Sequence, residues 1–405
     1  MALFASLRSR RLELDAAVAR RWRGGEAASH GVQLNDWIRR VSLAWPLVAA
    51  GTSRGGVVVA DLCAGSLVAQ DVNAHPGRAS GSSVASGMRL LHGEYDGGGL
   101  TAVALVQHHP HPRLATAGRD CGVRLWHVDG DELMPLGRLG PEEVLVSAVE
   151  IAPDGASLWA AGLDGAVRRF DDPFERSASR APALTLRCPS PVLAIATSDE
   201  LSVVACASAA GAVHLFDLSD GRPRGVWKAF GFEEAGDETL RIRRGERARS
   251  VAFVERLGGW SVVAGGSNGG VCTRPVLRPT AAGEAVELFD EALPGARLEP
   301  DHGGPVVSLA AVCSGNSVAD SNLGTKGLFV SGAHDGTLRV WDLEPDGGRG
   351  GDSPAPGKPL YGLGGFKVWL GSVQTDGRRI VSDGRDNVVA VHDFSGDKVG
   401  SPLVS

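Results

Sequence analysis

Serine, histidine and acidic side chains occur together in the last third of the chain, where their types match those of a hydrolase triad. The residues are His302, Ser331 and Asp335. A nucleophilic serine of that kind stands at a sharp Gly-x-Ser-x-Gly turn between a strand and a helix. Ser331 instead lies inside an alternating apolar run that predicts a strand. We therefore interpret these residues as structural.

Two further motifs suggest chemistry but are better explained as turns. Residues 108–112 read His-His-Pro-His-Pro, and imidazoles close in sequence can share a zinc ion. This segment falls where two strands of a repeat must be joined, and proline suits such a turn. The glycine-rich run at residues 265–270 lacks the Gly-Lys-Ser/Thr of a phosphate-binding loop and opens a strand. We thus predict no catalytic residue, no metal site and no cofactor, and a protein that is not an enzyme.

The element that must position these residues is a repeat with seven copies. The clearest copy, at residues 328–343, reads LFVSGAHDGTLRVWDL: an apolar strand, a tight turn, and an alternating strand that ends in an aromatic residue and Asp. The turn residues of the seven copies are Arg54, Asp120, Asp164, Ala210, Asn268, Asp335 and Asp386. Six positions after each of them stand Ala60, Trp126, Phe170, Phe216, Arg274, Trp341 and His392. Each copy predicts a β-hairpin.

A further short apolar strand precedes every hairpin, and a more polar strand usually follows it. The predicted first strands occupy residues 41–45, 100–106, 144–151, 192–196, 249–254, 306–312 and 366–373. Four strands repeated seven times predict an all-β fold, a seven-bladed β-propeller with four-stranded antiparallel blades. Residues 1–36 form a separate Arg-rich segment, in which the spacing of apolar residues predicts a short helix.

With these repeats the chain, over residues 40–405, resembles the WD-repeat β-propeller family of transducin-like proteins. Only Trp341-Asp342 is a literal Trp-Asp pair. In that family a histidine, a Ser or Thr, the turn Asp and the Trp form a hydrogen-bonded tetrad. The resemblance implies such a structural tetrad at His302, Ser331, Asp335 and Trp341. It also implies a partial tetrad that lacks the histidine, at Thr116, Asp120 and Trp126.

The propeller is predicted to span residues 37–405, with inserts at residues 73–99, 231–248, 313–327 and 344–359. The first two inserts join a last strand to the next first strand, so we expect them on the face that carries the hairpin turns. The other two are expected on the opposite face. Two strands could close the ring: one from residues 398–404, or one from residues 30–35.

Composition excludes several classes of function. The 405 residues carry 41 Lys and Arg against 47 Asp and Glu, and a net charge of -6 offers no basic field for nucleic acid. The sequence contains no run of 18 apolar residues and therefore predicts no membrane-spanning helix. The six cysteines include no Cys-x-x-Cys pair, which favours a reducing compartment, the cytoplasm or the nucleus. The alternative is an organelle, if residues 1–25 act as a targeting peptide.

Function is therefore expected on a surface. The leading interpretation is a non-catalytic scaffold or adaptor, a monomeric propeller within a complex, whose partner is a protein with an acidic or phosphorylated peptide. The arginines expected to bind it are Arg54, Arg119, Arg241, Arg243, Arg244, Arg247, Arg249 and Arg385. Residues 18–23 resemble the end of an F-box domain, which leaves open a substrate receptor of a ubiquitin ligase. An enzyme or small-ligand binder that uses the central channel is the third alternative, which convergent polar residues at the channel mouth would favour.

Overall fold

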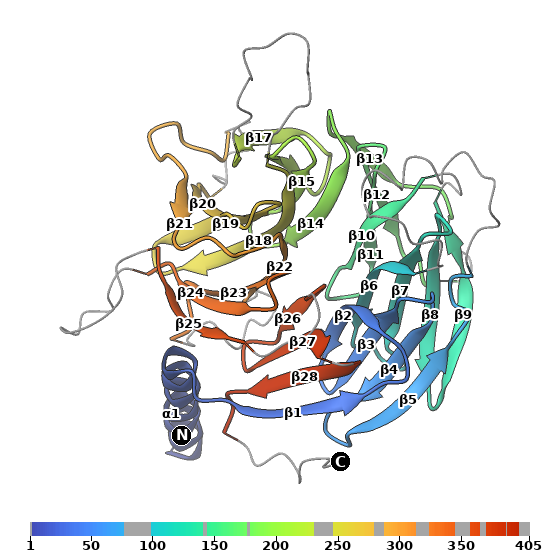
Figure 1. The fold of residues 1–405 in the computed structure, drawn as a ribbon, viewed down its shortest axis with the longest axis horizontal. Helices are drawn as coiled ribbons and strands as arrows, with labels where there is room; N and C mark the ends of the chain where they lie inside the picture. Colours follow the sequence, from blue (N-terminus) through green and yellow to red (C-terminus); the bar gives the residue numbers. More distant parts are fainter. Residues whose placement is uncertain are drawn as a thin grey trace.

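The computed structural model describes most of the chain as a ring of β-sheets (Figure 1). The described residues are 2–76, 99–140, 144–175, 179–230, 246–278, 287–312, 324–344, 357–364, 370–385 and 387–396. They form seven four-stranded antiparallel sheets around a central channel. The predicted seven-bladed β-propeller is confirmed, and so is a helical segment before it, α1 (Ala2–Gly24).

The strands of each blade follow one another in the sheet, from the channel outward, except in the last blade. Blade one consists of β2 (Ile38–Ala44), β3 (Leu47–Thr52), β4 (Val57–Asp61) and β5 (Ser66–Asp71). Blade two consists of β6 (Leu100–Val106), β7 (Arg113–Gly118), β8 (Val123–Asp129) and β9 (Glu132–Leu139). Blade three consists of β10 (Val146–Ile151), β11 (Ser157–Gly162), β12 (Ala166–Asp171) and β13 (Leu184–Arg187). Blade four consists of β14 (Val192–Ser198), β15 (Val203–Ser208), β16 (Ala212–Asp217) and β17 (Pro223–Lys228). Blade five consists of β18 (Ala248–Arg256), β19 (Gly259–Gly266), β20 (Val271–Val276) and β21 (Ala296–Leu298). Blade six consists of β22 (Val306–Ala311), β23 (Leu328–Ala333), β24 (Leu338–Asp342) and β25 (Pro359–Leu363). Blade seven consists of β26 (Val373–Thr375), β27 (Arg379–Arg385), β28 (Val388–Asp393) and β1 (Ala28–Gln33).

The turn between the second and third strands is built alike in every blade. Directly after each predicted turn residue the backbone is left-handed, with φ between 60° and 96°. The seven residues with this conformation are Gly55, Cys121, Gly165, Gly211, Gly269, Gly336 and Asn387. Glycine adopts such a φ without steric cost and asparagine tolerates it, which explains why the repeats share this position. We call the side of the ring that carries these turns the turn face, and the opposite side the far face.

The ring is closed by the N-terminal region. Strand β1 pairs with β28 from Ala28↔Asp393 to Gln33↔Val388, so the outermost strand of blade seven comes from before blade one. Of the two closures that the sequence allows, the structure has the N-terminal one. Residues 398–404 lie outside the described residues.

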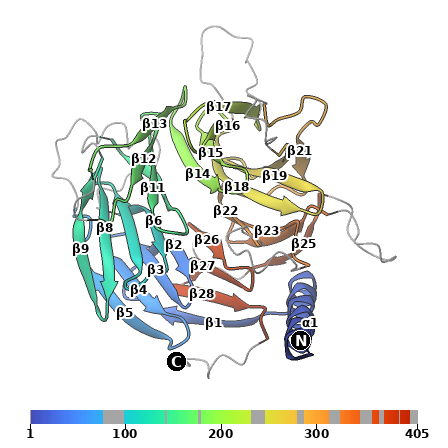
Figure 2. The same cartoon turned by 180° about the vertical axis from the view of Figure 1, so that it is seen from behind.

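Helix α1 packs beside this closing strand and the edge of blade six (Figure 1 and Figure 2). Trp22 is fully buried, stacks on Phe394 with ring centroids 4.1 Å apart, and donates from Nε1 to the Gly377 carbonyl at 3.0 Å. Arg21 donates to the Ser395 carbonyl at 2.7 Å. The residues that resemble an F-box end therefore fasten the helix to the propeller.

Around the channel, serine hydroxyls of the first strands link neighbouring blades. In five of the seven blade junctions such a bond joins one blade to the next, at 2.6 to 3.3 Å. The bonds are Ser147 to the Val192 carbonyl, Ser250 to the Val306 carbonyl, Ser308 to the Val373 carbonyl, Ser372 to the Val41 carbonyl, and the Leu105 amide to Ser42. These bonds satisfy polar groups that water would otherwise have to reach.

The predicted inserts lie mostly outside the described residues, which leave out 77–98, 231–245, 313–323 and 345–356. Their attachment points are defined by the strands. The first two leave an outer strand and enter the next inner strand, at the turn face, whereas the other two connect strands at the far face. Of the predicted first strand of blade seven, residues 366–373, positions 366–369 lie outside the described residues, and β26 begins at Val373.

Candidate binding site

A β-bulge lies near the start of six of the seven inner strands. At each bulge the pairing with the second strand skips one residue, for example between Ile38 and Arg40 and between Ala248 and Ser250. The skipped residues are Arg39, Thr101, Ser147, Leu193, Arg249 and Val307. A bulge redirects the side chain of the extra residue, and all six residues line the channel at the turn face.

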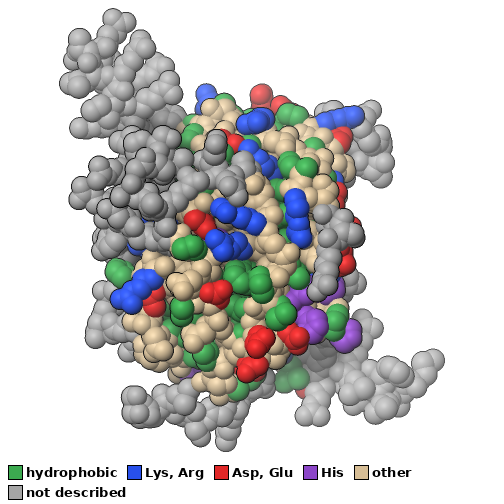
Figure 3. Space-filling model, turned by 90° about the vertical axis from the view of Figure 1, so that its right-hand side faces the viewer, with side chains coloured by type: hydrophobic (Ala, Val, Ile, Leu, Met, Phe, Trp, Pro, Cys, Tyr) green, Lys and Arg blue, Asp and Glu red, His purple; other side chains and the backbone are tan. Residues whose placement is uncertain are grey.

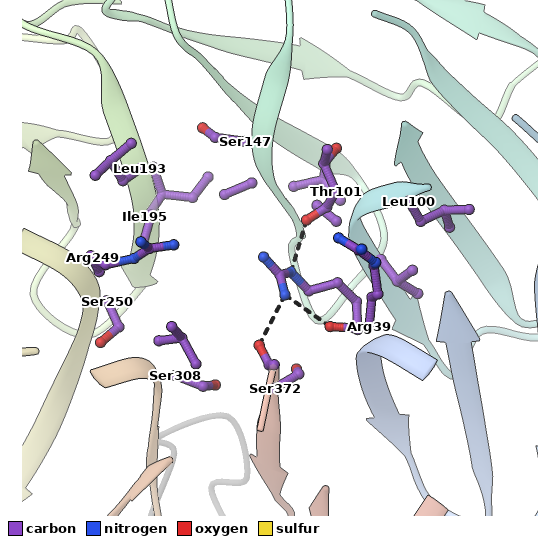
Figure 4. Close-up of a pocket in the computed structure, with 18 of the residues that line it drawn as sticks. Arg39, Leu100, Thr101, Ser147, Leu193, Ile195, Arg249, Ser250, Ser308 and Ser372 are labelled. Carbon is purple, nitrogen blue, oxygen red and sulfur yellow. Dashed lines mark hydrogen bonds between the residues drawn. The ribbon is translucent and has the colours of Figure 1, made fainter. Parts of the chain in front are cut away.

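The channel opens there into a cavity of about 210 Å³ (Figure 4). Arginines from three blades line it. Arg39 and Arg40 come from β2, Arg249 from β18, and Arg119 from the turn after β7. Figure 4 shows Arg39 and Arg249 on opposite sides of the opening. No Asp or Glu is among the described residues that line this cavity. We call these four arginines the channel-mouth cluster.

Arg40 holds three blades together at the mouth. Its Nε donates to the Thr101 carbonyl of blade two at 2.9 Å, and its Nη1 donates to the Gly371 carbonyl before blade seven at 3.0 Å. A third bond joins Nη1 to the Arg39 carbonyl at 2.8 Å, and Figure 4 draws all three as dashed lines. Burial lowers the pKa of Arg40 to about 10, so the guanidinium stays charged at neutral pH.

Asp383 supplies a counter-charge to Arg40, but a weak one. The buried carboxylate of Asp383 accepts hydrogen bonds from the backbone amides of Gly371 and Ser372 at 2.9 and 2.7 Å. Burial nevertheless raises the pKa of Asp383 to about 7, so a large fraction of it is protonated at neutral pH. Burial, with help from Arg249 and Arg40, lowers the pKa of His334 to about 4. The mouth therefore carries an excess of positive charge.

The structure brings only part of the predicted arginine set together. Arg119 and Arg249 belong to the channel-mouth cluster. The pKa of Arg249 is lowered by burial and, to a smaller extent, by the charge of Arg247. Arg54 is 85% exposed and lies 3.9 Å from Asp36, away from the channel. Arg385 is in β27, but its side chain is not described. Outside the described residues fall Arg241, Arg243 and Arg244.

Sequence reasoning missed Arg39 and Arg40 because it began the first strand of blade one at Val41. The strand begins at Ile38, and Arg39 occupies the bulge position that Arg249 holds in blade five. An apolar pattern alone does not reveal a bulge, because the extra residue breaks the alternation.

The four tetrad residues of blade six meet in one hydrogen-bonded chain. The imidazole of His302 lies 3.1 Å from Asp335 through Nδ1 and 2.7 Å from Ser331 through Nε2. The indole of Trp341 donates to the Ser331 hydroxyl at 2.8 Å. Ser331 is completely buried, so a substrate cannot reach its hydroxyl. This geometry supports a structural role.

Blade two contains the same arrangement, including a histidine that the sequence analysis had judged missing. His75 lies 2.7 Å from Asp120 through Nδ1 and 2.8 Å from Thr116 through Nε2. Trp126 donates to the Thr116 hydroxyl at 3.0 Å. The expectation of a partial tetrad was wrong because the insert separates His75 from the blade it serves.

At the far face the channel is lined by acidic side chains instead of arginines. A cavity of about 370 Å³ is lined there by Glu150, Asp199 and Glu200. Glu150 accepts hydrogen bonds from the Thr197 hydroxyl at 2.7 Å and amide at 3.3 Å, while its second carboxylate oxygen is buried and has no partner among the described residues. Burial raises the pKa of Glu150 from 4.5 to about 7.

Replacing Glu150 with glutamine is expected to stabilise the protein at pH 8 by about 1–2 kcal/mol. The native state holds the Glu150 proton more tightly than the unfolded state, so wild-type stability is lost as pH rises from 4.5 through 7. The amide cannot ionise and escapes this loss. Urea unfolding of both proteins at pH 5 and pH 8 measures the difference, and a gain of equal size at both pH values would contradict it.

The His-His-Pro-His-Pro segment lies in the turn between β6 and β7, as predicted. Histidine side chains gather on the side of the molecule that carries blade two (Figure 3). His111 stacks on His127 with centroids 5.8 Å apart, and His127 stacks on Phe174. Among the described residues no group of three or more His, Cys, Asp or Glu is placed to hold a metal ion.

Comparison with known families agrees with this geometry. The family model described as WD domain, G-beta repeat matches residues 88–127 and 298–342. These matches include the Ser/Thr, Asp and Trp of the two complete tetrads, in blades two and six. No curated protein matches the sequence. Within the described part of the chain, no helix is long and apolar enough to cross a membrane.

Proposed function

We propose that this chain, a seven-bladed WD-repeat propeller protein, is a non-catalytic scaffold that binds a protein partner on its turn face. The observation that carries the proposal is the channel-mouth cluster. It places Arg39, Arg119 and Arg249 at the centre of the face where the first two predicted inserts attach. The partner is expected to present an acidic or phosphorylated peptide, and the propeller acts as a monomer within the complex.

Charge contrast supports the choice of face. The chain has a net charge of -6, yet the turn-face mouth is lined by arginines and by no described carboxylate. A local positive potential on an acidic protein steers an acidic ligand to one place.

The proposal that the protein is non-catalytic is supported by the lack of access for a substrate to the candidate serine. The candidate serine, Ser331, is enclosed by His302 and Trp341. Its hydroxyl is committed to those two side chains, which leaves it no room to attack a substrate. No disulfide joins the five cysteines among the described residues, as expected in the proposed cytoplasm or nucleus.

The two alternative functions, a ubiquitin-ligase receptor and an enzyme or small-ligand binder, each require a different structural feature. A substrate receptor of a ubiquitin ligase needs an adaptor-binding segment, whereas Trp22, from the F-box-like residues, is buried against the propeller. A small-ligand binder needs convergent polar groups in the channel, and the channel-mouth cluster meets that condition.

Reversing the charge of Arg119 and Arg247 to Glu is expected to remove the partners that wild-type protein captures. The test is affinity purification with mass spectrometry from the same lysate. Arg222→Glu is the matched control, because Arg222 is 74% exposed and lies in a loop at the far face. A second variant replaces residues 231–245 of the insert with a short glycine linker and so leaves β18 intact.

Partners that are lost from the turn-face variants but kept by the control support the proposal. Unchanged capture by folded turn-face variants would overturn it. Recovery of ligase subunits with wild type would favour the ligase alternative instead. Circular dichroism and thermal melting of each variant establish that the propeller is intact.

A further inference from the structure

The far-face end of the channel holds the second cavity, of about 370 Å³, which the proposed function does not use. Residues from all seven blades line it. We infer that this cavity binds a primary ammonium ligand: its N–H groups donate to the Glu150 carboxylate, and an oxygen atom of the same ligand accepts from the Trp260 indole. The cavity lies opposite the turn face, so this inference does not depend on the proposed function.

Charge is the first argument for a cation. Three carboxylates line the cavity: Glu150 from β10 in blade three, and Asp199 and Glu200 from the turn after β14 in blade four. No Lys, Arg or His is among the described residues that line it. The rest of the wall is mostly apolar, with side chains such as Leu105 and Phe253. Opposite charges attract more strongly beside such a wall than in open water.

The carboxylates also destabilise one another in their charged forms. Burial is the main cause that raises the pKa of both Glu150 and Asp199. The charge of Asp199 raises the pKa of Glu150 further, and the charge of Asp154 raises that of Asp199. A cation bound beside these carboxylates offsets the repulsion, which favours its binding.

Two buried polar atoms of the lining residues have no hydrogen-bond partner among the described residues. One carboxylate oxygen of Glu150 accepts from the Thr197 hydroxyl and amide, whereas the other, Oε2, is buried and unpaired. Trp260 is only 4% exposed near the start of β19, and its indole Nε1 is also buried and unpaired. Buried polar groups are rarely left without a partner, so both atoms point to a ligand.

The two unpaired atoms define what the ligand must offer. Oε2 of Glu150 is an acceptor, and an ammonium group supplies it with a charge-assisted N–H donor. The indole of Trp260 can only donate, so it requires an acceptor atom. A lysine residue of a peptide combines an ammonium group with backbone carbonyls, and a free amino alcohol combines it with a hydroxyl. The shared chemistry is a primary ammonium group with an oxygen acceptor in the same ligand.

The test is isothermal titration calorimetry at pH 8, where Glu150 is mostly ionised. The probes are a short Gly/Ser peptide with one lysine, the same peptide with norleucine in its place, and a linear aminopentanol with its amine and hydroxyl at opposite ends. Wild type should bind at least one of the two amine probes saturably, and the norleucine peptide not at all. Tighter binding of the lysine peptide assigns the site to a partner's lysine, and tighter binding of the aminopentanol assigns it to a small free amine.

Glu150→Gln should weaken amine binding about tenfold or more, because it removes a charge-assisted hydrogen bond. This variant is expected to be more stable than wild type at pH 8, so unfolding does not explain its loss of binding. Trp260→Phe keeps an aromatic ring without the N–H group and should weaken binding about threefold. Glu132→Gln is the matched control, because Glu132 is exposed on the outer strand β9, and it should bind as wild type does.

Absence of saturable binding of both amine probes at millimolar concentration would overturn the inference. Equal affinity for the lysine and norleucine peptides together with no binding of the aminopentanol would also overturn it. So would an affinity in Glu150→Gln that equals that of the Glu132→Gln control. If Trp260→Phe fails to fold, the comparison of the two glutamate variants still decides.

Discussion

Replacing Trp22 with alanine is expected to lower the free energy of unfolding by about 3–5 kcal/mol, the range for removing a buried aromatic side chain. Trp22 is completely buried, and its loss leaves a cavity beside Phe394 and an unpaired Gly377 carbonyl. It also loosens α1 from the blade that closes the ring. Equilibrium unfolding in urea measures the change.

Leu14→Ala on the same helix is the matched control, because Leu14 is 57% exposed. Its effect should be small. A deletion of residues 1–36 should be more damaging than Trp22→Ala, since it removes β1 as well as the helix. Equal stability of Trp22→Ala and Leu14→Ala would show that the contact of α1 with the propeller does not stabilise the fold.

Replacing His75 with alanine is expected to cost about 2–4 kcal/mol, because two buried partners lose their hydrogen bonds at once. Among the described side chains, Asp120 would keep its bond from Arg124, and Thr116 would keep its bond from the Trp126 indole. His111→Ala is the control, since His111 is 38% exposed and lies in a turn at the far face. The measurement is again urea unfolding of wild type and both variants.

A cost for His75→Ala no greater than that for His111→Ala would mean that the tetrad of blade two contributes nothing to stability. The corresponding variant in blade six, His302→Ala, extends the comparison, because His302 makes the same two contacts. A smaller loss is expected in blade six, because Asp335 would keep its bonds from the Gly303 amide and from the amide and hydroxyl of Thr337.

The features predicted correctly from the sequence are those that short segments encode. The seven turns could be found because a left-handed residue such as Gly336 or Asn387 must follow the turn residue, within the same hairpin. The apolar alternation of the second and third strands is equally local. These signals fix the blade count and the four-stranded design without reference to distant parts of the chain.

The features that sequence analysis missed or left open depend on contacts between distant segments. His75 serves Thr116 across an insert, and β1 has a polar sequence whose partner, β28, is remote in the chain. Arg39 reaches the channel only because a bulge turns it there. The sequence therefore predicted part of the candidate site. It identified Arg119 and Arg249, but only the closed ring shows that they lie near Arg39 and Arg40.

The closing strand also sets an order of events during synthesis. Ser29 and His392, which meet in blade seven, are 363 positions apart, so β1 leaves the ribosome long before its partner exists. Until β28 is made, β1 has no ladder to join, and the outer edge of blade seven cannot be covered. The propeller therefore becomes a closed ring only after β28 has been made, and any chain that stops before residue 388 stays open.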